Sequence, residues 1–259
     1  MTPTALADIT SFLDDELNVA GTPDYPGALN GLQVENTSPV TRVAVAVDAS
    51  VLTIEGAIAA GANLLIVHHG LFWSGAQPLR DRVFRRFRQL LVNDVAVYSS
   101  HLPLDVHPRL GNNAILARTL GLDPTEGFCH YQSVAVGVMG NADVATSALA
   151  AALDTIARSH GSTLVTVGDV GAKRTRRWAI CTGAGASSQT LREAAEARVD
   201  TLIVGEGAHH TGVEAQELGI TVFYAGHYAT ETFGVRALGA ELEMKFGLPW
   251  SFVAAPTGL

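Results

Sequence analysis

The sequence predicts an α/β fold with two related domains, each containing a sheet flanked by helices. Short apolar runs rich in valine, isoleucine and leucine alternate with alanine-rich stretches along the 259 residues, which is the order typical of α/β proteins. Several runs lack the polar alternation of a half-exposed strand, so both faces of these strands are expected to be buried. The chain also repeats its own pattern once, which predicts the second domain.

The expected strands and helices follow from the residue types along the chain. Runs of β-branched and aliphatic residues predict strands at 43–47, 64–67, 95–98, 134–138, 178–181, 202–204 and 221–224. The stretches between them predict helices at 51–60, 82–91, 111–120, 144–159, 189–198 and 230–246. An acidic amphipathic helix with Leu6, Ile9 and Leu13 on its apolar face is expected before the first strand.

The internal repeat is visible when the two halves of the chain are compared. The first copy starts at Arg42 and the second at Arg177, and in each copy a histidine pair follows the second strand. The third strand of each copy is followed by a histidine and, four residues later, by a carboxylate. These features are His68-His69, His101 and Asp105 in the first copy and His209-His210, His227 and Glu231 in the second. The period is far longer than that of a solenoid repeat, so we expect two domains.

The charge balance argues against a nucleic-acid partner. The chain has 17 basic and 25 acidic side chains and a net charge of −8. A protein that binds a phosphate backbone needs clustered lysine and arginine to displace counterions. The densest basic runs, at 80–88 and 173–177, are short and are interpreted as solvated faces of a helix and a loop.

Cysteine content and hydropathy predict a cytoplasmic protein without a membrane partner. Cys129 and Cys181 are too few for a disulfide framework and predict free thiols in a reducing compartment. No apolar stretch reaches the roughly 20 residues that a membrane span needs. The first helix has no basic segment before it, which argues against a secretory signal.

The histidines collect at the ends of expected strands. Six of the nine follow the carboxyl end of a strand, and three carboxylates join them: His68, His69, His101, His209, His210 and His227, with Asp105, Glu206 and Glu231. In open α/β sheets the loops after these ends converge on the crevice where ligands bind. Imidazole with carboxylate and no thiolate suits zinc, manganese, iron, cobalt or nickel rather than calcium. The sequence therefore predicts a metal site, and His107, His130 and His160 are expected to be surface or structural residues.

The spacing of these residues favours two ions. His227 and Glu231 are four residues apart at the start of a helix, where this spacing places both side chains on one face. Adjacent His68 and His69 point to opposite faces of a continuing strand, so one histidine for each ion is the simpler geometry. A bridging carboxylate such as Glu231 would hold two ions about 3.5–4 Å apart.

Each motif also has a structural interpretation. A single histidine after a strand is more often a hydrogen-bonded structural residue than a ligand, and polar pairs four apart occur on many helices. The segment 183–188 is interpreted as a tight turn with a serine N-cap, because it lacks the spacing and the lysine of a phosphate-binding loop. Asp48 and residues 30–33 either line the crevice or serve as turn and cap residues. The coincidence of histidines at strand ends in both halves favours the metal site.

An ordered set of motifs resembles a known family. The motifs are NGLQV at 30–34, LIVHHG at 65–70, SHLPLD at 100–105, GNN at 111–113, GE at 205–206 with HH at 209–210, and GHYATE at 226–231. Together they resemble the Nif-three-like dinuclear metal-centre family, whose members are often labelled type 2 homologues of GTP cyclohydrolase 1. The resemblance covers nearly the whole chain and is to the short bacterial form without an inserted extra domain.

The resemblance implies a fold and an assembly. The fold is two interlocked α/β domains with mixed sheets flanked by helices, with the end of the chain returning to the first domain. We accordingly expect residues 1–124 together with 226–259 to form a metal-binding domain and 125–225 to form a second α/β domain. The assembly is a ring-shaped homohexamer with metal sites facing an internal cavity.

The resemblance also implies a ligand set for two divalent ions, zinc, manganese or iron. The family's ligands fall on His68, His69, Asp105, His227 and Glu231. In the expected roles His68 with Asp105 serves one ion, His69 with His227 serves the other, and Glu231 bridges them.

Two further residues are candidates for proton transfer beside these ions, and one motif departs from the family. His101 belongs to a matching motif, and His101 and Glu206 are the candidate catalytic residues. Many relatives have a single histidine where this chain has His209 and His210, so the sequence leaves open which of the two faces the site.

Two functions from different classes fit these features. The first is metal-assisted hydrolysis of a small substrate, a nucleotide-like ring included. The alternative is a metal-binding or metal-delivery protein without turnover that acts through partner contacts, and a scaffold with structural histidines is a third interpretation. Only Arg42, Arg80 and Arg109 are considered as partners for a triphosphate, so GTP as the substrate rests on the family label alone.

Overall fold

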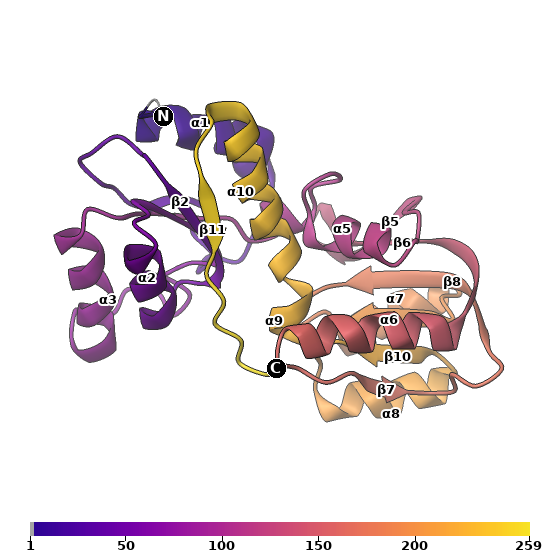
Figure 1. Cartoon of the computed structure of the whole chain (residues 1–259). Helices are drawn as coiled ribbons and strands as arrows, with labels where there is room; N and C mark the ends of the chain where they lie inside the picture. The colour runs from indigo at the N-terminus through magenta and orange to yellow at the C-terminus, as the bar shows by residue number, and fades with distance from the viewer. Residues whose placement is uncertain (1–2) are drawn as a thin grey trace. The chain divides into compact units, whose positions relative to one another are not determined.

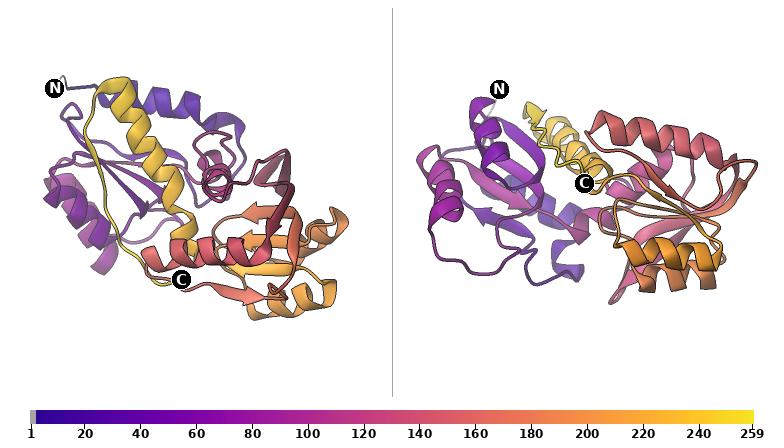
Figure 2. Two further views of the ribbon diagram at one scale, coloured as in Figure 1. Left: turned by 45° about the vertical axis from the view of Figure 1, so that its right-hand side comes forward. Right: turned by 90° about the horizontal axis from the view of Figure 1, so that it is seen from below.

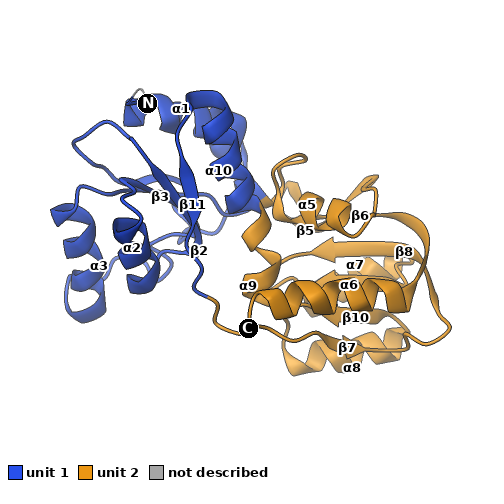
Figure 3. Cartoon of the chain, in the orientation of Figure 1, with its two compact units in different colours: residues 1–104, 234–255 blue, residues 105–233, 256–259 orange. Residues whose placement is uncertain are grey.

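The computed structural model describes residues 3–259, which form two compact units (Figures 1 and 3). Unit 1 contains the chain up to Leu104 and the segment Gly234–Ala255. Unit 2 contains Asp105–Phe233 and Pro256–Leu259. Neither unit is therefore a continuous stretch of sequence.

Unit 1 contains one five-stranded sheet and the helices that cover it. Its elements are α1 (Leu6–Glu16), η1 (Val19–Gly21), β1 (Gly31–Val34), β2 (Val43–Asp48), α2 (Val51–Ala59), β3 (Leu64–His69), α3 (Asp81–Val92), β4 (Ala96–Ser99) and β11 (Trp250–Phe252). Helices α4 (Leu102–Asp105) and α10 (Thr232–Phe246) contain the residues at which the chain changes unit. The strand order is β1-β4-β3-β2-β11, with β1 antiparallel to β4 and the other neighbours parallel.

Strand β3 lies at the centre of this sheet, between β2 and β4. Helices α2 and α3 lie on one side of the sheet and α10 on the other (Figure 2, right), so β3 is buried on both faces, as its unbroken apolar sequence predicts. A capping box begins α2 directly after β2. The Ser50 hydroxyl accepts a hydrogen bond of 3.2 Å from the Thr53 N–H, and the Thr53 hydroxyl accepts one of 2.9 Å from the Ser50 N–H. The cap holds Asp48 at the carboxyl end of β2.

Unit 2 contains a six-stranded sheet. Its elements are α5 (Asn112–Thr119), β5 (Glu126–Tyr131), β6 (Val134–Ala145), α6 (Thr146–Ser159), β7 (Val165–Val167), β8 (Arg174–Cys181), α7 (Ser188–Glu196), β9 (Thr201–Val204), α8 (His209–Leu218), β10 (Thr221–Tyr224) and α9 (His227–Thr230). The strand order is β5-β6-β8-β9-β10-β7. Strands β8, β9 and β10 are parallel, while β5, β6 and β7 pair antiparallel with their neighbours.

The side chains of β8 alternate between two hydrophobic clusters on opposite faces of this sheet. Trp178 and Ile180 pack with residues of α5 and α6, whereas Ala179 and Cys181 pack with residues of α7 and α8. Figure 2 (right) shows α6 and α8 on opposite sides of the sheet. The period of two in side-chain direction thus explains how one apolar run supplies both cores.

The predicted fold class is confirmed, because both sheets are mixed and flanked by helices. Each contains a parallel core of three consecutive strands, β2-β3-β4 in unit 1 and β8-β9-β10 in unit 2, joined by helices in the same order. Four strands have no counterpart among the ranges expected from the sequence, namely β1, β5, β7 and β11. All four lie at sheet edges, where partly exposed strands lack the continuous apolar runs of central strands.

The chain changes unit at positions that differ from the domain boundaries expected from the sequence. The first change lies between Leu104 and Asp105 rather than at 124–125, because α5 packs against β6 and β8. The return lies between Phe233 and Gly234 rather than at 225–226, because α9 contacts α5 and α6.

The two cysteines are free thiols, as the sequence predicts. The Cys181 thiol donates a hydrogen bond to the Cys129 sulfur.

Within residues 3–259, no helix has the length and the apolar character needed to cross a membrane.

The core position of Trp178 gives a prediction for the stability of unit 2. Its side chain is fully buried, so Trp178→Ala is expected to lower the free energy of unfolding by about 3–5 kcal/mol. Trp178→Phe, which keeps most of the ring, is expected to cost clearly less. Urea unfolding followed by circular dichroism measures both changes, and equal losses for the two variants would contradict this description of the core.

Candidate metal centre

The two histidines at the end of β3 are each oriented by an oxygen atom. His68 is fully buried, and its Nδ1 lies 2.9 Å from the carbonyl oxygen of Ser100. The Nδ1 of His69 lies 2.9 Å from Oδ1 of Asp48. A hydrogen bond at Nδ1 fixes the ring and makes Nε2 the nitrogen that would bind a cation.

His101 is oriented in the same way by a buried carboxylate. Its Nδ1 lies 2.8 Å from Oδ1 of Asp24, and the Asp24 carboxylate also accepts hydrogen bonds from the Asn30 side chain and the Leu102 N–H. Burial raises the pKa of Asp24, but the hydrogen bond and charge of His101 and these other donors hold the pKa below its usual value. Asp24 is therefore a charged acceptor that holds the His101 ring in place.

These three histidines form one cluster in unit 1. The ring centroid of His68 lies 4.7 Å from that of His69 and 4.9 Å from that of His101. One nitrogen from each ring lies within 4.8 Å of the others. Trp73 packs edge-on against His101, with centroids 4.8 Å apart. Three imidazoles gathered at the end of a buried strand are a suitable donor set for a divalent transition metal.

Unit 2 holds a second group, formed by His227, Glu206 and Glu231. Gly226 has a φ of 96° and turns the chain from β10 into α9, which begins at His227. Nε2 of His227 lies 3.1 Å from Oε2 of Glu231, and Nδ1 lies 2.8 Å from Oε1 of Glu206. Burial lowers the pKa of His227, but the hydrogen bonds and charges of Glu231 and Glu206 raise the pKa to about 9. The contact four residues along the chain agrees with the predicted spacing.

The Glu231 carboxylate rests against the backbone of Gly183. Gly183 has a φ of 63°, and a Cβ at this position would collide with Oε1 of Glu231. The Gly183 N–H donates a 3.0 Å hydrogen bond to the hydroxyl of Thr230, the residue before Glu231. The turn after β8 therefore fixes the position of this carboxylate. Ser187 caps the following helix α7 by accepting from the Thr190 N–H, as the structural interpretation of 183–188 predicts.

Asp105 lies in unit 2 and is held by the two asparagines that begin α5. Its side chain is buried, and Asn112 donates a 2.8 Å hydrogen bond to Oδ1. Asn113 donates to the carbonyl oxygen of Val136 and accepts from the Thr182 N–H. The GNN motif thus connects Asp105 to α5 and to the neighbouring strands.

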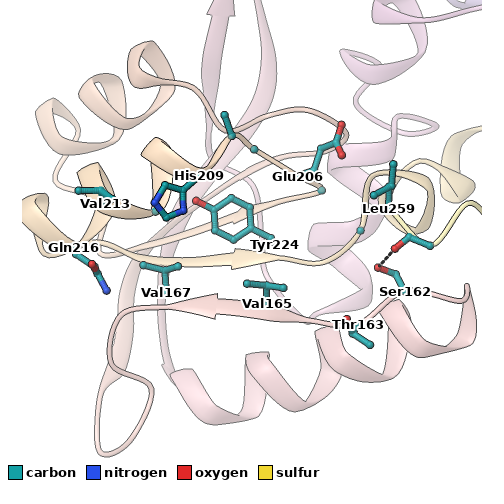
Figure 4. Close-up of a pocket in the computed structure, with 16 residues that line it drawn as sticks. Ser162, Thr163, Val165, Val167, Glu206, His209, Val213, Gln216, Tyr224 and Leu259 are labelled. Carbon is teal, nitrogen blue, oxygen red and sulfur yellow. Dashed lines mark hydrogen bonds between the residues drawn. The ribbon is translucent and has the colours of Figure 1, made fainter.

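A pocket of about 490 Å³ lies beside Glu206 in unit 2 (Figure 4). The ring of Tyr224 lies between His209 and Glu206, and Val165, Val167 and Val213 contribute apolar walls. His209 is the member of the histidine doublet that lines this pocket. No lysine or arginine is among the described residues that line it, so the pocket suits an uncharged, flat group rather than a phosphate.

Two carboxylates that contact the clustered histidines, Asp24 and Asp48, are not predicted as their partners from the sequence, because each contacts a histidine that lies far away along the chain. The three histidines expected to be surface or structural residues have contacts of their own. Nδ1 of His130 lies 2.7 Å from Oε1 of Glu193. Nδ1 of His160 lies 2.9 Å from the carbonyl oxygen of Ile156. Nδ1 of His107 accepts a hydrogen bond from the Leu110 N–H.

Comparison with known proteins identifies the family. The family model described as Duf34/NIF3 (NGG1p interacting factor 3) matches residues 4–256. The chain belongs to the Duf34/NIF3 family.

Curated relatives of this NIF3-family chain carry a common name. A "GTP cyclohydrolase 1 type 2 homolog" from Deinococcus radiodurans is 38% identical over 252 residues, which cover 97% of this chain and 94% of that protein. A protein of the same name from Halobacterium salinarum is 43% identical over 261 residues, with 98% and 99% covered. The crystal structure of TTHA1606 from Thermus thermophilus matches with a TM-score of 0.83 and 34% identity, covering 99% of this chain and 100% of that one.

The contact between Gly183 and Glu231 gives a prediction for metal binding in this NIF3-family chain. Alanine at Gly183 would need a left-handed backbone and would also push Glu231 away. Gly219 is a matched control, because its φ is 69° and nothing lies within 4 Å of an added Cβ. The left-handed backbone is expected to cost about 1–2 kcal/mol of stability in both variants, but only Gly183→Ala adds the collision with Glu231 and is expected to weaken zinc binding, by about tenfold or more. Chelator competition measures the affinity, and equal zinc affinities for the two variants would contradict the assignment of Glu231.

The raised pKa of His227 gives a prediction for the metal-free protein. The folded-state pKa of about 9 lies above the ordinary value of 6.5. The ion pair with Glu231 and Glu206 therefore stabilises the fold fully below pH 6.5, and this stabilisation is lost as the pH rises through about 9. The stability difference between the chain and its His227→Gln variant is expected to shrink over this range. Unfolding measured from about pH 6 to about pH 10 tests this, and a constant difference would argue against the pair.

Proposed function

We propose that this protein binds two divalent metal ions and uses them to hydrolyse a small, nucleotide-like substrate. One observation carries the proposal: all four histidines of the two clusters have Nδ1 within 2.8–2.9 Å of an oxygen atom. Metal-ligating histidines almost always use their second nitrogen in this way. His130 and His160 also have such a contact, but His68, His69 and His101 in addition bring one ligand nitrogen each within 4.8 Å of the others.

The proposed ligand set is the one expected from the sequence. His68 with Asp105 would hold one ion, His69 with His227 would hold the second, and Glu231 would contribute to both. The mixture of imidazole and carboxylate fits zinc, manganese or iron. Bound divalent cations supply Lewis acidity and make hydroxide available at neutral pH.

The remaining residues of the clusters have roles that follow from their contacts. His101 is held by the charged Asp24 carboxylate, which fixes the position of its imidazole, and we assign it the holding or donation of a proton. Glu206 contacts Nδ1 of His227 through Oε1 and also lines the apolar pocket. We assign it the transfer of a proton between His227 and a group in that pocket.

The apolar pocket and the names of the relatives support a nucleotide-like substrate. The pocket beside Glu206 suits a flat, uncharged ring, and the curated relatives are named for a nucleotide cyclohydrolase. The proposal includes a small-molecule substrate, a homohexameric ring and a cytoplasmic location, as expected from the sequence.

Metal analysis of purified protein tests the proposal. Two ions per chain are expected by elemental analysis, and anomalous scattering is expected to place them at the proposed ligands. Glu231→Gln is expected to lose at least one ion, whereas Glu217→Gln, an exposed position on α8, is expected to lose none. Two tightly bound ions retained in Glu231→Gln would count strongly against the ligand set.

Activity assays separate the hydrolase from the alternative. Metal-loaded protein is offered GTP, phosphodiesters and small amides while its metal content is followed. Turnover that His68→Ala abolishes supports the enzyme. Transfer of metal to an apo-acceptor without turnover supports a delivery protein instead.

A further inference from the structure

A second pocket, of about 330 Å³, lies in unit 1 beside His69. Asp48 and His69 at the strand ends line it together with two arginines of helix α3, Arg82 and Arg86. Residues of the loop that follows β3, such as Trp73, complete the wall. The pocket therefore brings two guanidinium groups next to a proposed metal ligand.

Arg86 is attached to the strand ends by its own hydrogen bond. Its Nη1 donates to the carbonyl oxygen of Ala49 over 3.1 Å, and the Ala49 N–H donates to the carbonyl oxygen of His69 over 2.8 Å. Two successive hydrogen bonds thus connect the guanidinium group to the backbone of His69. This connection keeps Arg86 in the pocket wall.

The positive charges of the two arginines are not neutralised by a carboxylate of the described residues. Arg82 and Arg86 are four residues apart on α3, where like charges repel. Within residues 3–259 neither forms an ion pair with a carboxylate, and Nε of Arg86 is buried without a hydrogen-bond partner. Burial, followed by the charge of Arg82, lowers the pKa of Arg86, although a guanidinium group stays charged at neutral pH. Asp48, the carboxylate in the same pocket, accepts from His69.

The arginines belong to the basic run that the sequence analysis interpreted as a solvated helix face. Residues 80–88 contain five arginines and one aspartate in a chain of net charge −8. Arg88 is exposed as that interpretation predicts, but Arg82 and Arg86 line the pocket beside His69. Two arginines of the basic run therefore form part of a pocket wall.

We propose that this pocket binds a phosphate group of the substrate, so that the substrate is a phosphorylated small molecule. The inference rests on the function proposed above, because it assigns the substrate class of that same site. A guanidinium fork matches the oxygen atoms of a phosphate group in a bidentate manner. The volume suits a single small ligand, and the negative charge of the whole chain disfavours a nucleic-acid polymer.

Binding of guanosine monophosphate and of guanosine to metal-free protein tests the inference. At low ionic strength, where exposed charges are least screened, calorimetry is expected to show at least about tenfold tighter binding of the monophosphate. The double variant Arg82→Gln, Arg86→Gln is expected to remove this difference. Arg88→Gln is the matched control, because it removes the same charge from the same helix outside the pocket, and it is expected to keep the difference.

Three results would overturn the inference. They are equal affinities for the monophosphate and the nucleoside, an equal loss in the Arg88 variant, and tighter binding of a single-stranded oligonucleotide than of the monophosphate. If the double variant fails to fold, Arg82→Gln alone gives the test, because Arg82 is exposed. Binding is measured without metal, so failure of the hydrolase assay and failure of phosphate binding are separate outcomes.

Discussion

The hydrogen bond between an oxygen atom and Nδ1 of each strand-end histidine is the interaction on which the candidate metal centre depends. An isolated imidazole rotates about its side-chain bonds and carries its proton on either nitrogen. An acceptor at 2.8–2.9 Å fixes the ring of each of these histidines. His68 uses a backbone carbonyl, whereas His69, His101 and His227 use carboxylates. These acceptors make Nε2 the nitrogen that would bind a cation, so they define the centre as much as the ligands do.

Parallel strands supply the second constraint. Because β3 is buried between two parallel neighbours, its carboxyl end is the first point at which polar side chains can leave the apolar core, and His68 and His69 occupy that point. The third parallel strand of each unit also ends at a histidine. His101 follows β4 in unit 1, and Gly226 turns the chain from β10 into His227 in unit 2. The repeated fold thus offers equivalent positions for His101 and His227, which explains why the histidines of both halves follow the same pattern.

The parallel cores and the strand-end histidines could be predicted from the sequence, because both depend on local patterns. Edge strands such as β11 could not, since their pairing is decided by a distant partner, here β2. The same limit applies to the site. The contact of His227 with Glu231 follows from a spacing of four, but Asp24 and His101 lie 77 residues apart, and no local pattern connects them. The contact of Gly183 with Glu231 likewise depends on how β8 and α9 pack.

The last segment of the chain contributes residues to both units. Strand β11 pairs with β2 at the edge of one sheet, and a few residues later the carbonyl oxygen of Leu259 accepts a hydrogen bond from the N–H of Tyr228, next to His227. Leu259 also lines the apolar pocket. Deletion of Leu259 would therefore remove part of the wall of that pocket and the backbone acceptor of Tyr228 in a single change.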